Sequence, residues 1–155
     1  MNLEKTPDTT ENITIYGIAY DSCLLTPMTR EVNGKTIEEY GLNIGLDSKT
    51  AETLQQKIDG LLISAVGYLP ANIVSPIYTG DEINIEQPYA ISVGSMYRPK
   101  HLKYEVQDGS KCMVVVNIRC YKGSRHPGVA LKVNYIRPIP QKPKKTSRYF
   151  KKRNK

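Results

Sequence analysis

The chain has 155 residues, a formal net charge of +7 and an apolar fraction of 39%, which suits one globular domain with a modest core. It contains no run of about 18 apolar residues, which argues against a membrane-spanning helix. The N-terminal residues lack the basic start and apolar stretch of a signal peptide, so we expect a cytoplasmic protein with reduced cysteines and no membrane partner.

The first part of the chain predicts two strands joined by a tight turn. Apolar residues alternate over Asn12–Tyr20 and again over Thr36–Leu46. The Asn33-Gly34 pair between them is typical of a hairpin turn. On the second strand Gly41 and Gly45 fall on the face opposite the apolar residues, where a missing side chain permits a bend or the close approach of another backbone.

One helix is predicted after these strands. Asp47 and Ser48 are residues that cap helix N-termini. From Ala51 to Val66 the apolar residues recur at helical spacing, with polar residues on the opposite face, and Gly67 ends the pattern. We expect this helix to have a packing role.

The later part of the chain predicts more strands and then a basic tail. A short strand is expected over Leu102–Val106, the strongest strand over Cys112–Tyr121, and an alternating strand over Val129–Arg137. Gln141–Lys155 contains eight cations and no acid. Such a segment has too little apolar surface to offset the entropy of ordering it.

This order of elements predicts a mainly β fold, a small antiparallel barrel with one α-helix between strands. A barrel also removes the free sheet edges that many short strands would expose. We expect a disordered N-terminus over residues 1–11, the barrel domain over 12–138 and a disordered, flexible basic tail over 139–155.

Charge is divided unevenly along the chain. Residues 1–95 carry a net charge of −8, whereas residues 96–155 carry +15. Such a division indicates a polyanion as partner. Proteins that bind membrane surfaces usually carry a basic amphipathic helix. The basic part of this chain is predicted as strands, so nucleic acid is favoured over lipid as the partner. The alternative is that the cations only solvate one face.

No catalytic or metal-binding motif is present, so we expect neither an enzyme nor a cofactor. His101 and His126 are expected on the surface. Cys112 and Cys120 are eight residues apart on one predicted strand, about 26 Å, and cannot share an ion. We expect them to be small buried hydrophobic residues.

Tyrosines and cations alternate along two later segments, Tyr97–Tyr104 and Arg119–His126. Single-stranded nucleic acid suits this pattern, because cations neutralise phosphates and rings stack on exposed bases. Duplex DNA offers no free base faces, so the pattern favours single strands. Tyr121 and Tyr97 are better candidates for stacking than Tyr16 and Tyr40, which we expect in the core.

The predicted nucleic-acid-binding set combines the tyrosines and cations of these segments and of the last strand: Tyr97, Arg98, Lys100, Lys103, Tyr104, Arg119, Tyr121, Lys122, Arg125, Lys132, Tyr135 and Arg137. Further phosphate contacts are expected from cations of the tail: Lys142, Lys144, Lys145, Arg148, Lys151, Lys152 and Arg153.

Three segments also carry a resemblance to a known family. They are Glu39–Asp47 running into the helix, Gly109–Tyr121, and Pro127–Ile136, and the layout extends over residues 13–137. In this layout the chain resembles phage-type single-stranded DNA-binding proteins with an OB-fold, and more distantly the phage T7 type. The T7 type has an acidic C-terminal tail that recruits partners, whereas the tail here is basic.

The resemblance implies an OB-like barrel that coats single-stranded DNA (ssDNA) in phage DNA replication or recombination, within the cytoplasm of a bacterial host. The expected partners are ssDNA, phage or host replication or recombination proteins, and a second copy of the chain. Two alternatives stay open. One is a phage-encoded protein-interaction module that binds a host replication or defence protein, and the other is an RNA-binding OB protein.

Overall fold

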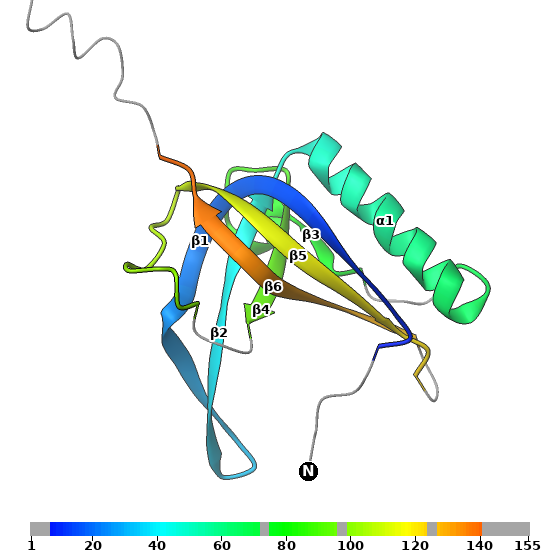
Figure 1. Ribbon diagram of the computed structural model, residues 1–155, viewed down its shortest axis with the longest axis horizontal. Helices are drawn as coiled ribbons and strands as arrows, with labels where there is room; N and C mark the ends of the chain where they lie inside the picture. The colour runs from blue at the N-terminus through cyan, green and yellow to red at the C-terminus, as the bar shows by residue number, and fades with distance from the viewer. Residues whose placement is uncertain (1–6, 72–74, 96–98, 124–126, 141–155) are drawn as a thin grey trace, which may run out of the picture.

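The computed structural model describes residues 7–71, 75–95, 99–123 and 127–140. The described part is mainly β and contains one α-helix between strands (Figure 1). The elements in chain order are β1 (Thr9–Val32), β2 (Lys35–Leu46), α1 (Ser48–Val66), β3 (Ile77–Thr79), the 3-10 helix η1 (Gly80–Ile83), β4 (Tyr89–Ser95), β5 (Lys111–Tyr121) and β6 (Gly128–Pro138).

Five strands close into a barrel with the ring order β1–β2–β4–β6–β5. Neighbouring strands are antiparallel except β4 and β6, which meet in parallel at Gly94 and Lys132. The short strand β3 pairs with β4 beside the ring. The predicted small barrel with one helix between strands is therefore confirmed.

β1 is longer than the sequence predicted, and it serves two parts of the fold. It begins at Thr9, which pairs with Cys120 of β5, and continues without a break to Val32. Its last residues pair with β2 in a two-stranded arm (residues 28–39) that projects from the barrel (Figure 1). The predicted hairpin turn is confirmed, since Asn33 and Gly34 have φ angles of 53° and 78°.

The core lies inside the barrel and is built by alternate residues of its strands. On β5 every second residue from Cys112 to Cys120 is fully buried, which confirms the interpretation of both cysteines as small hydrophobic residues. The prediction for Tyr16 was wrong, because its side chain is 53% exposed. Ile15 and Gly17 take the inward positions of β1, so the residue between them faces out.

α1 packs against β1, β5 and β4 and lies beside the barrel (Figure 1). The Asp47 carboxylate accepts a hydrogen bond from the Thr50 N–H at 2.7 Å, and the helix ends at Gly67, whose φ is 88°. These caps confirm the predicted helix. No helix in the part of the chain that the structure describes is long and apolar enough to cross a membrane. The buried face comprises Ala51, Leu54, Ile58, Leu62 and Ala65.

Residues 99–110 form a loop before β5, so the short strand predicted over Leu102–Val106 was wrong. The Glu105 carboxylate ties this loop to β1. It accepts hydrogen bonds from the backbone N–H groups of residues 24–26 at 2.9–3.2 Å, and from the Ser22 hydroxyl. β1 is irregular in its pairing with β2 at this point, and the carboxylate satisfies N–H groups there.

Gly41 provides a test of the closure between β2 and β4. A Cβ added to Gly41 would lie 2.5 Å from the carbonyl oxygen of Val93, which confirms the predicted close approach of another backbone. We expect Gly41→Ala to lower the free energy of unfolding by about 1–3 kcal/mol, because the two strands must move apart. Urea denaturation measures the change.

The matched control is Gly60→Ala on α1. A Cβ there has no neighbouring atom within 4 Å. We expect it to raise the free energy of unfolding by up to about 1 kcal/mol, because alanine favours the helix. Equal effects of the two substitutions would contradict the pairing of β2 with β4.

The second prediction concerns Glu105. Burial alone would raise the pKa of Glu105, but the hydrogen bonds from Ser22 and residues 24–26 outweigh burial and lower this pKa. Its stabilising contribution is therefore complete above the unfolded pKa of about 4.3 and is lost as the pH falls through the lower, folded pKa. We expect Glu105→Gln to lower the free energy of unfolding at neutral pH by about 1–3 kcal/mol.

The same substitution should also reduce the fall in stability on acidification below about pH 4. Urea denaturation at neutral and acidic pH gives both quantities. Glu52→Gln, at an exposed position of α1, serves as the control and should leave both nearly unchanged. A pH profile of Glu105→Gln that coincides with that of the unmodified chain would show that Glu105 does not hold the loop.

Candidate nucleic-acid interface

The buried side chains of β5 fix which of its residues face outward. Successive side chains of a strand point to opposite faces, and alternate residues from Cys112 to Cys120 are buried. The strand register then places Lys132 of β6 opposite Asn117 of β5. We call the resulting surface the outer β5–β6 face. It comprises Met113, Val115, Asn117, Arg119 and Tyr121 of β5 and Lys132, Tyr135 and Arg137 of β6.

The outer β5–β6 face carries cations and no acid. Asp108 is the last acidic residue of the sequence, so β5 and β6 contain only positive charges. By contrast, η1 carries Asp81 and Glu82 and no cation, and on α1 the charges of Glu52 and Asp59 are balanced by Lys49 and Lys57. The uneven charge along the sequence therefore becomes an uneven charge over the fold, with cations and no acid on β5 and β6. This side of the barrel attracts polyanions.

Arg119 is oriented by a polar network that the sequence analysis missed. Its Nε donates a hydrogen bond to Oδ1 of Asn117 at 2.8 Å. The amide nitrogen of Asn117 donates in turn to Thr10 at 3.0 Å and to Asn12 at 2.9 Å, both on β1. A guanidinium held in this way loses less conformational entropy when it binds a phosphate. The two-residue spacing of Asn117 and Arg119 on one strand was the signal that could have revealed this pair.

The loop before β5 lies against the end of β6. The ring of His101 stacks on Tyr135, with ring centroids 4.6 Å apart and planes inclined by 16°. Its Nε2 lies 2.5 Å from the carbonyl oxygen of Ile136. Lys100 and Asn134 help to line a slot of about 270 Å³ between the loop and the strand. The sequence placed His101 on the surface without a role, and its contact with Tyr135 depends on the tertiary fold.

The other described members of the predicted set lie on the segments that precede and follow β5. Lys103 and Tyr104 are on the loop before β5, and Tyr104 is 81% exposed. Tyr121 ends β5 and is half-buried, and the N–H of Lys122 donates to the Asp8 carboxylate at 2.6 Å. β5 has 11 residues, so its two ends are roughly 33 Å apart. The predicted residues are therefore strung along a strand pair rather than gathered around one pocket.

Part of the predicted set lies outside the described residues. This applies to Tyr97, Arg98 and Arg125, and to the seven cations predicted in the tail. The structure brings five of the described members together on the outer β5–β6 face, namely Arg119, Tyr121, Lys132, Tyr135 and Arg137.

A second outer surface, the outer β2–β4 face, contains a hollow of about 410 Å³. Asn43 of β2 donates to Asp21 at 3.1 Å and accepts from Ser92 of β4 at 2.6 Å. The lining includes Asp21 and Glu39 and no cation. In OB-folds the second and third strands, here β2 and β4, form the usual oligonucleotide face. The hollow of the outer β2–β4 face is lined by Asp21, Cys23, Met28, Glu39, Tyr40, Gly41, Leu42, Asn43, Ser92, Val93 and Gly94, of which Leu42 and Val93 are buried core residues.

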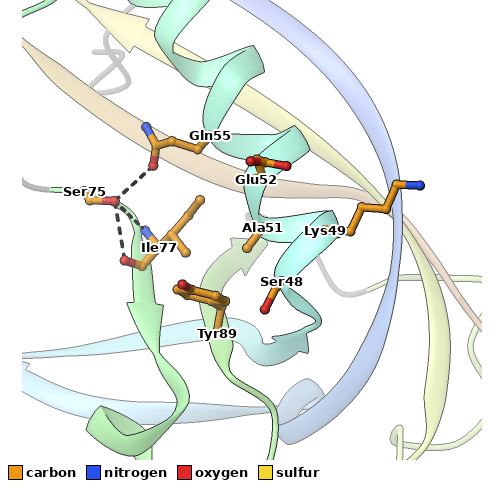
Figure 2. A pocket seen from close by; sticks show the side chains of 8 residues that line it. All are labelled: Ser48, Lys49, Ala51, Glu52, Gln55, Ser75, Ile77 and Tyr89. Carbon is orange, nitrogen blue, oxygen red and sulfur yellow. Dashed lines mark hydrogen bonds between the residues drawn. The ribbon is translucent and has the colours of Figure 1, made fainter.

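Figure 2 shows a further hollow, of about 700 Å³, between the first turns of α1 and the strands β3 and β4. The Ser75 hydroxyl reaches the side chain of Gln55 at 3.4 Å across it. Lys49 and Glu52 place opposite charges at its edge, which gives no preference for a polyanion. None of the predicted binding residues lines it. Within the described residues, no three His, Cys, Asp or Glu side chains are grouped as metal ligands would be.

The five-stranded barrel, antiparallel except between β4 and β6, is an OB-like barrel. The fold is similar to that of the single-stranded DNA-binding protein from bacteriophage Enc34 solved in complex with ssDNA, with a TM-score of 0.58, 14% identity, and coverage of 84% of this chain and 88% of that one. A C-terminally truncated form of that protein gives a TM-score of 0.57, 15% identity and coverage of 91% and 98%. A further structure of the same protein gives a TM-score of 0.51, 14% identity and coverage of 90% and 89%.

At this level of identity the likeness concerns the fold, and it confirms the OB-like barrel that the sequence resemblance implied. No protein-family model and no curated protein matches the sequence.

Proposed function

We propose that the chain is a sequence-tolerant ssDNA-binding protein that acts in phage DNA replication or recombination. The observation that carries the proposal is the outer β5–β6 face, where tyrosines and cations share one surface of an OB-type barrel without an acid. In its support, the solved structures with a similar fold are those of a phage protein that binds ssDNA.

Phosphate neutralisation accounts for the cations of this face. Arg119, Lys132 and Arg137 would each neutralise a phosphate and release its counterion. Lys100, Lys103 and Lys122 would extend the contacts at either end of β5. The cations of the tail would add contacts that are independent of sequence, and phage or host replication or recombination proteins remain the candidate protein partners.

Base stacking accounts for the tyrosines. A phenol ring exposed on a strand surface stacks on any base, so it adds affinity with little sequence preference. Tyr121 and Tyr135 lie on the same strand pair as the cations, and Tyr104 lies on the loop before β5. Bases are free for stacking only in a single strand, which separates this function from duplex binding.

The third prediction tests the cations. We expect Lys132→Gln and Arg137→Gln each to weaken the binding of oligo-dT, because each removes one cation that neutralises a phosphate. The slope of log K against log salt concentration should become shallower by about 0.7 for each phosphate that is no longer neutralised. Fluorescence anisotropy of a labelled oligo-dT at several salt concentrations measures both quantities.

Lys57→Gln is the matched control, because it removes the same charge from α1, where Lys57 lies 2.7 Å from Glu11. It should leave the slope nearly unchanged. Asn43→Ala tests the outer β2–β4 face in the same assay, and a larger loss there than for Lys132→Gln would place the DNA on that face. A binding constant of the unmodified chain that is independent of salt would overturn the proposal.

The fourth prediction tests stacking. We expect Tyr121→Ala to weaken the binding of ssDNA by about 1–3 kcal/mol, because one base loses its ring partner. Binding to a duplex of equal length should change less, and Tyr121→Phe should retain the affinity for ssDNA. An equal loss on single strand and duplex would argue against stacking. RNA of the same sequence, used as competitor, tests the RNA-binding alternative.

A further inference from the structure

The stacked pair of His101 and Tyr135 is built from two separate elements. His101 comes from the loop before β5 and Tyr135 from β6, and their planes are inclined by only 16°. The carbonyl oxygen of Ile136 accepts hydrogen bonds only, so the Nε2 that lies 2.5 Å from it carries the proton. This hydrogen bond fixes the orientation of the imidazole. The pair is therefore held in place before any ligand arrives.

A bulge in β6 exposes the residue next to this pair. Val115 of β5 pairs with Tyr135 and Val116 pairs with Val133, so the ladder skips Asn134 between them. A bulge re-aims a side chain that regular pairing would have placed on the other face. As a result Asn134 and Tyr135 are consecutive in sequence and both exposed.

The slot of about 270 Å³ brings these groups together. One part of its lining is aromatic, from His101 and Tyr135, while Asn134 supplies an amide and Lys100 a positive charge. Its volume is slightly below the roughly 300 Å³ at which pockets for drug-sized ligands begin. A flat aromatic ligand with a polar edge and an attached anion matches this set of groups.

We propose that the slot binds a single nucleobase of the ssDNA strand, stacked on the His101–Tyr135 pair. The Asn134 amide contacts the edge of the base, and Lys100 contacts its phosphate. The inference rests on the proposed function and goes beyond it, since it adds His101 and Asn134 and assigns one nucleotide a fixed position on the protein. Because the rings are already ordered, binding loses little side-chain entropy.

A competing explanation is that the stack only fastens the loop to β6. Tyr135 remains 38% exposed although His101 stacks on its ring, so the residue is accessible to a ligand. The two explanations differ in one measurable respect. If the slot binds a base, a substitution in it weakens the binding of a strand with bases more than that of a strand without them. If the stack only attaches the loop, the substitution affects both strands equally.

The test compares oligo-dT with a strand of equal length that carries only abasic deoxyribose-phosphate units. We expect Tyr135→Ala and His101→Ala to weaken the binding of oligo-dT by about five-fold to more than a hundred-fold, the range typical of removing one ring from a base–aromatic stack. Binding of the abasic strand should change by less than about two-fold, because it has no base to lose. Asn134→Ala should show the same selectivity with a smaller loss.

Tyr135→Phe should retain affinity for oligo-dT, because it keeps the ring. The matched control is Tyr68→Ala, which removes a ring that is 61% exposed just beyond the end of α1 and should affect neither strand. Thermal unfolding of each variant shows whether it is folded. If Tyr135→Ala does not fold, His101→Ala and Asn134→Ala decide.

Equal losses on both strands, or no loss on either, would overturn the nucleobase slot while leaving ssDNA binding intact. A failure of the unmodified chain to bind either strand would instead overturn the proposed function itself. Selective loss on oligo-dT alone supports the slot.

Discussion

The pairing of β5 with β1 on one side and β6 on the other is the constraint on which the rest of the structure depends. Both ladders run along nearly the whole of β5. A register slip by one residue would turn Arg119 inward and Cys120 outward. A buried guanidinium without partners costs far more than a buried thiol. The packing of the core and the display of the cations are therefore set by the same register.

Two contacts then fix the loop before β5 relative to this strand. The Glu105 carboxylate attaches it to β1, and the His101 ring attaches it to β6. β1 and β6 are the two neighbours of β5, so the loop is held on both sides of the strand that follows it. Under the proposed function, this anchoring keeps Lys100 at the end of the outer β5–β6 face.

Local patterns in the sequence predicted the features that depend on local physics. The caps at Asp47 and Gly67 and the turn at Asn33-Gly34 were confirmed, since each is specified by a few neighbouring residues. The alternation of β5 was strong enough to predict its buried cysteines. The set of residues proposed to bind nucleic acid stays a prediction.

The features that were missed depend on contacts between distant segments. Leu102–Val106 has an apolar content that suits a strand. Instead, Glu105 accepts hydrogen bonds from N–H groups about 80 residues earlier in the chain, and the segment forms a loop. Asn117 and His101 gained roles only from the strand ladder and the loop, which no local pattern specifies.

The two outer faces differ in what they offer to a nucleic acid. The outer β2–β4 face is the usual OB ligand face. Of the two acids at its hollow, Glu39 is paired with Arg30 at 2.8 Å, which leaves Asp21 as the acid without a cation partner among the described ion pairs. Lys132 lies where the two faces meet, since its Nζ is 3.8 Å from the position of a Cβ on Gly94. Under the proposed function, a strand with its phosphates along β5–β6 would have its bases within reach of Gly94 and Asn43, whose amide suits base edges. This arrangement would also keep the phosphates away from Asp21 of the second face.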